Sequence, residues 1–198
     1  QKGWFEVQDE GSQLVSDLVY ARQGEQIFDF CAGAGGKTLA MCASMENKGQ
    51  VHAYDSNKQR LAPIFDRLKR AGTRNVQVHS PKDDLTGLEG KMDRVLIDAP
   101  CTGSGTWRRR PDAKWRLTPE TLEARMADQA GVLDEAAKYV RPGGFLVYVT
   151  CSVFPQENEH QVYAFGDRNE QFDLLSAGEV WQDLFGFDKP KPWSSDLK

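Results

Sequence analysis

The sequence lacks the features that mark a membrane, secreted or metal-binding protein. No apolar run approaches the roughly 18 residues that cross a bilayer, and no signal-peptide pattern opens the chain. We therefore expect a cytoplasmic protein without a membrane partner, and the start at Gln1 is typical of mid-protein sequence. Cysteine is scarce and forms no C-x-x-C pair, which predicts reduced thiols and no bound metal (Cys31, Cys42, Cys101 and Cys151).

A general excess of positive charge is also absent, since the formal net charge is −4. Proteins that bind nucleic acid usually carry a basic patch, and here the basic residues concentrate in one segment. Guanidinium groups and flat rings together suit a phosphate backbone and an unstacked base. The alternative is a solvated loop with two buried tryptophans, Trp107 and Trp115. The RNA-contacting residues that this segment predicts are Trp107, Arg108, Arg109, Arg110 and Lys114.

Strand and helix patterns alternate along the chain, which predicts a parallel sheet. An amphipathic helix is expected over residues 8–20, capped by Ser12, and a long helix begins with Thr118 as cap and Pro119 in its first turn. The segment 141–144 stops that helix before the fifth strand. The expected strands are 27–30, 51–54, 76–79, 94–97 and 145–149, the other expected helices are 37–45, 57–70 and 157–165, and a weaker strand is expected at 172–175.

The glycine-rich turn after strand 27–30 fails to match two known ligand motifs. The dinucleotide fingerprint would need glycine where Thr38 stands, and the phosphate loop, although it fits Gly36 and Lys37, would need glycine where Cys31 stands. A ligand with an adenosine and a carboxylate but no phosphates fits both mismatches. Backbone N–H groups of the turn would contact the carboxylate, and Asp55 would bind the ribose hydroxyls. S-adenosylmethionine is such a ligand, although Asp55 could also be a turn residue and Lys37 a solvated one.

Two short blocks place a thiol after a strand. Asp98 and Cys101 follow the fourth predicted strand, and Cys151 follows the fifth. If these strands are neighbours in a parallel sheet, their carboxyl ends lie about 5 Å apart, and both sulfurs face the crevice where open α/β sheets bind ligands. The bland alternative is a pair of buried cysteines that end strands, which is the interpretation we give to Cys42.

Two thiols and an acid suit the transfer of a methyl group to C5 of cytosine. That carbon is a poor nucleophile, so a thiolate must first add at C6, assisted by a group such as Asp98 that hydrogen-bonds or protonates the base. The C5 proton must then leave and the bond from sulfur to the base must break. A second thiol can supply the base for that step, so the chemistry alone leaves open which cysteine attacks.

These motifs together carry a resemblance to a known family: Gly3 to Phe5, Gln8 to Glu10, the loop 31–38, Asp98 to Thr106 with Arg109, Pro111, Asp112 and Trp115, and Thr150 to Ser152 with Glu157, Asn158 and Glu159. They resemble the Sun/Fmu (NOL/NOP2/Sun) RNA cytosine-5 methyltransferases. The resemblance implies a class I methyltransferase fold, an α/β Rossmann-like fold with a doubly wound, mostly parallel sheet in three layers. It implies S-adenosylmethionine as donor and an RNA cytosine as acceptor.

By motif position, the resemblance implies that Cys151 is the nucleophile and that Cys101 helps to release the product, with Asp98 as the third catalytic residue. The acidic residue after the third strand is Asp83 or Asp84, of which we favour Asp83. Ala34 stands where the family usually has proline. The cofactor site implied by the resemblance comprises Cys31, Ala32, Gly33, Ala34, Gly35, Gly36, Lys37, Asp55, Asp83 and Asp98.

The resemblance covers residues 3 to about 165, and the chain lacks the family's terminal Asp-Gly-Phe-Phe strand and an N-terminal RNA-binding domain. We therefore expect a catalytic fragment and a monomer, with residues 1–24 as a helical lead-in and 25–198 as the methyltransferase domain. Ribosomal RNA is the expected substrate, with transfer RNA as the alternative. A nucleotide-hydrolysing P-loop protein and a non-catalytic RNA-binding module are the other hypotheses.

Overall fold

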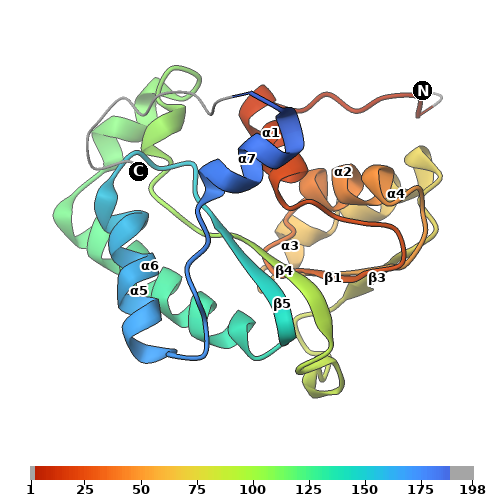
Figure 1. Ribbon diagram of the computed structural model, residues 1–198. Helices are drawn as coiled ribbons and strands as arrows, with labels where there is room; N and C mark the ends of the chain where they lie inside the picture. Colours follow the sequence, from red (N-terminus) through yellow and green to blue (C-terminus); the bar gives the residue numbers. More distant parts are fainter. Residues whose placement is uncertain (1–2, 188–198) are drawn as a thin grey trace. The chain divides into compact units, whose positions relative to one another are not determined.

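The computed structural model describes residues 3–187, which form two compact units (Figure 1). Of the described residues, the first unit holds 3–98 and Glu135–Val147, and the second holds Ala99–Asp134 and 148–187. The expected lead-in helix belongs to the first unit. Within residues 3–187, no helix is long and apolar enough to cross a membrane.

A five-stranded parallel sheet forms the centre of the first unit (Figure 1). Its strands lie in the order β3-β2-β1-β4-β5. The chain builds outward from β1 to β3 and then returns to place β4 beside β1, so the winding reverses between β1 and β4. This confirms the prediction of a doubly wound parallel α/β sheet, in which ligands bind at the carboxyl ends near the reversal. The strands are β1 (Gln26–Asp29), β2 (Gln50–Tyr54), β3 (Val76–His79), β4 (Met92–Asp98) and β5 (Val140–Val149).

Helices α1 (Glu10–Leu18), α2 (Gly36–Ser44), α3 (Lys58–Leu61) and α4 (Ile64–Ala71) belong to the first unit. Leu61 and Ile64 are buried against Ala53 of β2, which removes their apolar surface from water. The single helix expected over 57–70 is wrong. Pro63 divides it because proline has no backbone N–H to continue the helical hydrogen bonds, while Asn57 caps the first part.

Two other local expectations also differ from the structure. Asp9, not Ser12, stands at the N-cap of α1, so Ser12 lies inside the helix. The segment 141–144, expected as a turn, belongs to β5. A Cβ at Gly144 would lie 2.9 Å from the carbonyl oxygen of Met92, so glycine lets these two strands approach closely.

The second unit contains most of α5 (Pro119–Ala137), together with α6 (Glu159–Arg168) and α7 (Ala177–Phe185). The expected strand at 172–175 is wrong. Phe172 packs edge-on against Phe165 of α6, with ring centroids 5.3 Å apart, so this half-buried ring contacts a helix instead of pairing in a strand. Helix α7, capped by Ser176, was not expected. The rest of the C-terminal region is expected as a loose tail, and its residues 188–198 lie outside the described residues.

A buried histidine pair on the sheet predicts acid-sensitive stability. His52 Nδ1 lies 2.9 Å from His79 Nε2, and burial followed by repulsion from His79 lowers the pKa of His52 to about 4. Between about pH 6.5 and 4, the imidazole of His52 is therefore protonated in the unfolded chain but not in the folded chain. The free energy of unfolding falls as pH falls through this window. We expect this difference in protonation of His52 to lower the free energy of unfolding by up to about 3 kcal/mol at the acidic end of the window.

Urea unfolding of the wild type and of His52→Gln at pH 7.5 and pH 4.5 checks this expectation. Glutamine can still hydrogen-bond His79 but does not titrate, so the variant should lose less stability on acidification. The difference between the two proteins isolates His52 from Asp29, whose raised pKa acts in the opposite direction. Equal losses in both proteins would contradict the assignment.

Candidate active site

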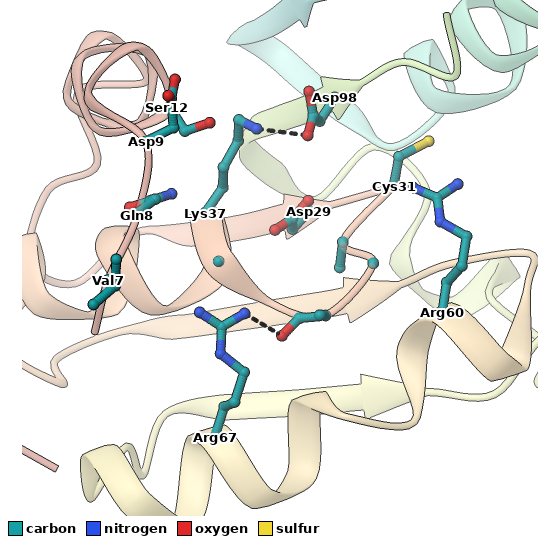
Figure 2. Close-up of a pocket in the computed structure, with 14 residues that line it drawn as sticks. Val7, Gln8, Asp9, Ser12, Asp29, Cys31, Lys37, Arg60, Arg67 and Asp98 are labelled. Atoms are coloured by element: carbon teal, nitrogen blue, oxygen red, sulfur yellow. Dashed lines mark hydrogen bonds and ion pairs between the residues drawn. The ribbon is translucent and has the colours of Figure 1, made fainter. Parts of the chain in front are cut away.

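A cavity of about 340 Å³ lies at the carboxyl ends of β1 and β4, where the winding of the sheet reverses (Figure 2). This volume is within the range of small-molecule sites. All of its walls belong to the first unit. They come from the N-terminal segment, the loop after β1, the start of α2, two arginines that follow β2, and the end of β4. The lining residues are Val7, Gln8, Asp9, Ser12, Asp29, Cys31, Ala32, Gly33, Ala34, Gly36, Lys37, Arg60, Arg67 and Asp98.

The loop from Cys31 to Gly36 forms part of the cavity wall and leads into α2. Gly35, the N-cap of α2, has a left-handed backbone with φ of 81°, and a Cβ there would lie 2.4 Å from Ile64 Cγ1. Arg67 donates a hydrogen bond of 2.9 Å to the carbonyl oxygen of Ala34 (Figure 2). The helix therefore begins with its N–H groups beside the cavity, an arrangement that favours an anionic ligand group.

Asp55 hydrogen-bonds the backbone of this loop. It is 2% exposed, and its carboxylate accepts the N–H groups of Gly33 at 3.0 Å and Asn57 at 2.8 Å. Asp55 does not line the cavity among the described residues. Asp83 and Asp84 do not line it either, because their carboxylates accept N–H groups within their own loop, from Ser80 and Thr86. A cofactor role for Asp55 or Asp83 stays a prediction.

Acidic side chains from the two central strands face the cavity. Asp98 at the end of β4 accepts a 2.5 Å hydrogen bond from Lys37 (Figure 2). Asp29 at the end of β1 is 1% exposed, and one of its oxygens accepts the Thr38 hydroxyl at 2.6 Å. Its other oxygen has no hydrogen-bond partner among the described residues. Burial raises the pKa of Asp29 to about 7, further raised by Asp98 and partly offset by Thr38.

Asp29 and the two arginines of this cavity were not predicted from the sequence. An acidic residue that ends a buried strand directly before the glycine loop was the available signal for Asp29. No such signal marks Arg60 and Arg67. They lie on two helices, α3 and α4, and the point at which the chain divides into these helices decides which side chains face the cavity.

The structure brings the two predicted catalytic thiols together in the second unit. Cys101 Sγ lies 3.3 Å from Cys151 Sγ, and neither forms a disulfide. The hydrogen bond to Cys151, followed by burial and charge, raises the pKa of Cys101 well above its usual range. Cys101 therefore holds its proton and can donate it toward the sulfur of Cys151. Burial instead raises the pKa of Cys31 and Cys42 to about 12, which makes both poor nucleophiles.

The basic segment of the second unit is exposed. Arg108, Arg109, Arg110 and Lys114 all face solvent. Trp115 is 80% exposed, with Lys114 Nζ 4.6 Å from its ring centroid, so the alternative of two buried tryptophans is wrong for this residue. Trp107 packs edge-on against Phe154. In the described part of the chain, no three His, Cys, Asp or Glu side chains form a group that could hold a metal ion.

A family model described as 16S rRNA methyltransferase RsmB/F matches residues 17–187. The ribosomal RNA small subunit methyltransferase B of Escherichia coli O6:K15:H31 is 37% identical over 180 residues. That alignment covers 90% of this chain and 42% of the relative, so the chain spans less than half the length of that protein.

Several solved structures are similar to this chain in fold. NSun6 from Pyrococcus horikoshii with SFG is 32% identical, with a TM-score of 0.76 over 85% of this chain and 43% of that protein. The protein PH0851 is 37% identical, with a TM-score of 0.78 over 82% of this chain and 38% of that protein. Methyltransferases below 25% identity share the fold as well. The class I methyltransferase fold expected from the sequence is confirmed.

Proposed function

This chain belongs to the RsmB/F family of 16S rRNA methyltransferases, and we propose that it transfers a methyl group from S-adenosylmethionine to C5 of a cytosine in RNA. The observation that carries the proposal is the contact between two cysteine sulfurs, 3.3 Å apart. Two cysteines that only end strands would not need to contact each other. The reaction does need such a contact, because one thiol attacks and a second group beside it releases the product.

The cavity of the first unit fits S-adenosylmethionine by the charges of its walls. The open start of α2 and Arg67 suit the carboxylate of the amino-acid part. Asp29, with its unpartnered buried oxygen, and Asp98 suit positively charged groups. These carboxylates disfavour a triphosphate, which argues against the P-loop hypothesis. The relative NSun6 was solved with SFG, an analogue of S-adenosylmethionine, which supports the same assignment. When bound, the cofactor supplies an electrophilic methyl group.

Cys151 acts as the nucleophile in this proposal. Its thiolate adds to C6 of cytosine, and the electron pair of the C5–C6 double bond shifts onto C5 and the adjoining C4–N3 unit, which makes C5 nucleophilic. C5 would then bond to the electrophilic methyl carbon as the bond from that carbon to the sulfonium sulfur breaks, and S-adenosylhomocysteine would leave with that electron pair. Asp98, held by Lys37 and three residues before Cys101 in the chain, orients the base by accepting a hydrogen bond from its amine or, when protonated, donates to N3 and so stabilises the negative charge that develops there.

Cys101 acts in the second half of the reaction. Its pKa is raised mainly by its hydrogen bond to Cys151. Once the sulfur of Cys151 is bonded to C6, that acceptor is weakened and Cys101 gives up its proton to solvent more readily. The resulting thiolate removes the C5 proton, the C–H electron pair restores the C5–C6 double bond, and Cys151 leaves as a thiolate. One proton is released for each methyl group transferred.

The RNA is proposed to be that of the small ribosomal subunit, because the curated relatives carry that name. The exposed basic residues and Trp115 supply contacts for phosphates and a base. Transfer of labelled methyl groups to purified small-subunit rRNA and to tRNA, followed by bisulfite sequencing, tests the proposal. We expect 5-methylcytosine in the rRNA alone. Label on tRNA alone would reassign the substrate, and ATP binding without S-adenosylmethionine binding by calorimetry would contradict the proposed reaction.

A further inference from the structure

Glu157, at the end of the turn 155–157, contacts the segment that carries Cys101. Its side chain is fully buried. One carboxyl oxygen accepts the backbone N–H of Thr102 at 2.8 Å and the side-chain amide of Gln129 at 2.9 Å. The other accepts the Thr102 hydroxyl at 2.5 Å. Because Thr102 directly follows Cys101, these bonds fix the backbone from which the first thiol extends.

Asn158, the next residue, contacts the segment that carries Cys151. Its side-chain oxygen accepts the Thr150 hydroxyl at 2.5 Å. Its amide nitrogen donates to the carbonyl oxygens of Ser152 at 3.1 Å and Phe154 at 3.0 Å. Two of these bonded groups, on Thr150 and Ser152, stand immediately before and after Cys151, so the amide of Asn158 fixes the backbone from which the second thiol extends.

The two cysteine segments also contact each other directly. The N–H of Gly105 donates to the carbonyl oxygen of Cys151 at 2.9 Å, and a Cβ at Gly105 would lie 2.8 Å from that same oxygen. Ser104 Oγ lies 2.9 Å from Ser152 Oγ and accepts the N–H of Val153 at 2.8 Å. The segments therefore form one hydrogen-bonded assembly, and Glu157 and Asn158 provide its support.

We propose that Glu157 and Asn158 are positioning residues that together set the separation of the two thiols. They are consecutive, so the two points of support are about 3.8 Å apart between their Cα atoms and cannot drift independently. This inference rests on the proposed function for its consequence, since a misplacement of about 1 Å can cost about 10²-fold in rate. Neither side chain needs to touch the RNA or the cofactor.

The test measures, in the same proteins, the rate of S–S bond formation, which depends on the separation of the two thiols, and the rate of methyl transfer. Diamide takes two electrons and two protons from a pair of neighbouring thiols, which leaves one S–S bond and a reduced hydrazine. Peptide mapping by mass spectrometry follows the rate at which the Cys101–Cys151 bond forms. The variants are Glu157→Ala, Glu157→Gln, Asn158→Ala and Asn158→Asp. The matched control is Asp167→Asn, which removes one negative charge from an exposed position of α6.

We expect Glu157→Ala and Asn158→Ala to slow both S–S formation and kcat by about 10²-fold, with KM for RNA little changed. Glu157→Gln keeps an acceptor for Thr102 and should recover most of both rates. Asn158→Asp keeps the size of the side chain but places an oxygen against the carbonyls of Ser152 and Phe154, so it should behave like the alanine variant. Asp167→Asn should match the wild type.

Wild-type rates of S–S formation in Asn158→Asp and Glu157→Ala would overturn the positioning role, as would a loss in KM alone. The two proposals fail separately. A wild-type protein that methylates no RNA, but whose S–S formation still depends on Glu157 and Asn158, would support positioning and refute the proposed function. Methyl transfer by the wild type with no dependence of thiol reactivity on either residue would do the reverse.

Discussion

Replacing Cys101 with alanine traps the protein on its RNA, whereas replacing Cys151 with alanine prevents any covalent complex. Without Cys101, the thiolate of Cys151 still adds to C6 and methylation proceeds, but the C5 proton has no neighbouring base and the bond from sulfur to carbon persists. Without Cys151 no bond forms. We expect methyl transfer to fall by on the order of 10⁴-fold in Cys151→Ala and a stable adduct on a denaturing gel for Cys101→Ala.

Cys42→Ala is the matched control for this pair. It removes a thiol that is 2% exposed and that burial keeps protonated, so its RNA should be released as from the wild type. An adduct from Cys151→Ala would contradict the account. So would the absence of an adduct from Cys101→Ala in a preparation that binds RNA and S-adenosylmethionine.

Gly35→Ala should abolish binding of S-adenosylmethionine and lower the stability of the protein. The residue has φ of 81°, and its new Cβ would lie 2.4 Å from a side-chain atom of Ile64, which is fully buried. Left-handed backbone strain and overpacking together cost about 2 to 5 kcal/mol. The loop can escape the contact only by moving away from α4, which displaces the N–H groups at the start of α2.

Gly72→Ala provides the comparison for that experiment. Gly72 also has a left-handed backbone, with φ of 68°, but a Cβ there would meet no atom within 4 Å. It should therefore lose only about 1 to 2 kcal/mol from backbone strain and bind S-adenosylmethionine normally. Urea unfolding and titration calorimetry measure the two effects. Unchanged cofactor binding in Gly35→Ala would show that the loop after β1 is not the cofactor site.

Most strands of this fold could be predicted because they contain a short apolar stretch close to a polar or charged residue, whereas β3 alternates apolar and polar residues. The alternation of strands and helices predicts a parallel sheet, the family resemblance implies its doubly wound order, and β3 has the predicted bounds, 76–79. Expectations failed where a local pattern competed with packing. Phe172 packs against Phe165 of a helix, and the glycines at 143–144 allow strand contact rather than a turn.

Part of the candidate site could also be predicted from the ends of the strands. Cysteines and acids at strand ends are visible in the sequence, so Asp98, Cys101 and Cys151 could be named. Support from a distant segment is not visible: Glu157 reaches Thr102 across 55 positions of the chain, and nothing near Glu157 in the sequence indicates this contact. Likewise, the burial that raises the pKa of Asp29 arises only when α2 places Thr38 against β1.

The most direct test of the central claim is mass spectrometry of the adduct trapped by Cys101→Ala. After digestion with nuclease and protease, the account predicts a 5-methylcytosine nucleotide joined through C6 to the peptide that contains Cys151. A nucleotide joined to Cys31 or Cys42, or a methyl group found elsewhere than C5 of the trapped base, would contradict it.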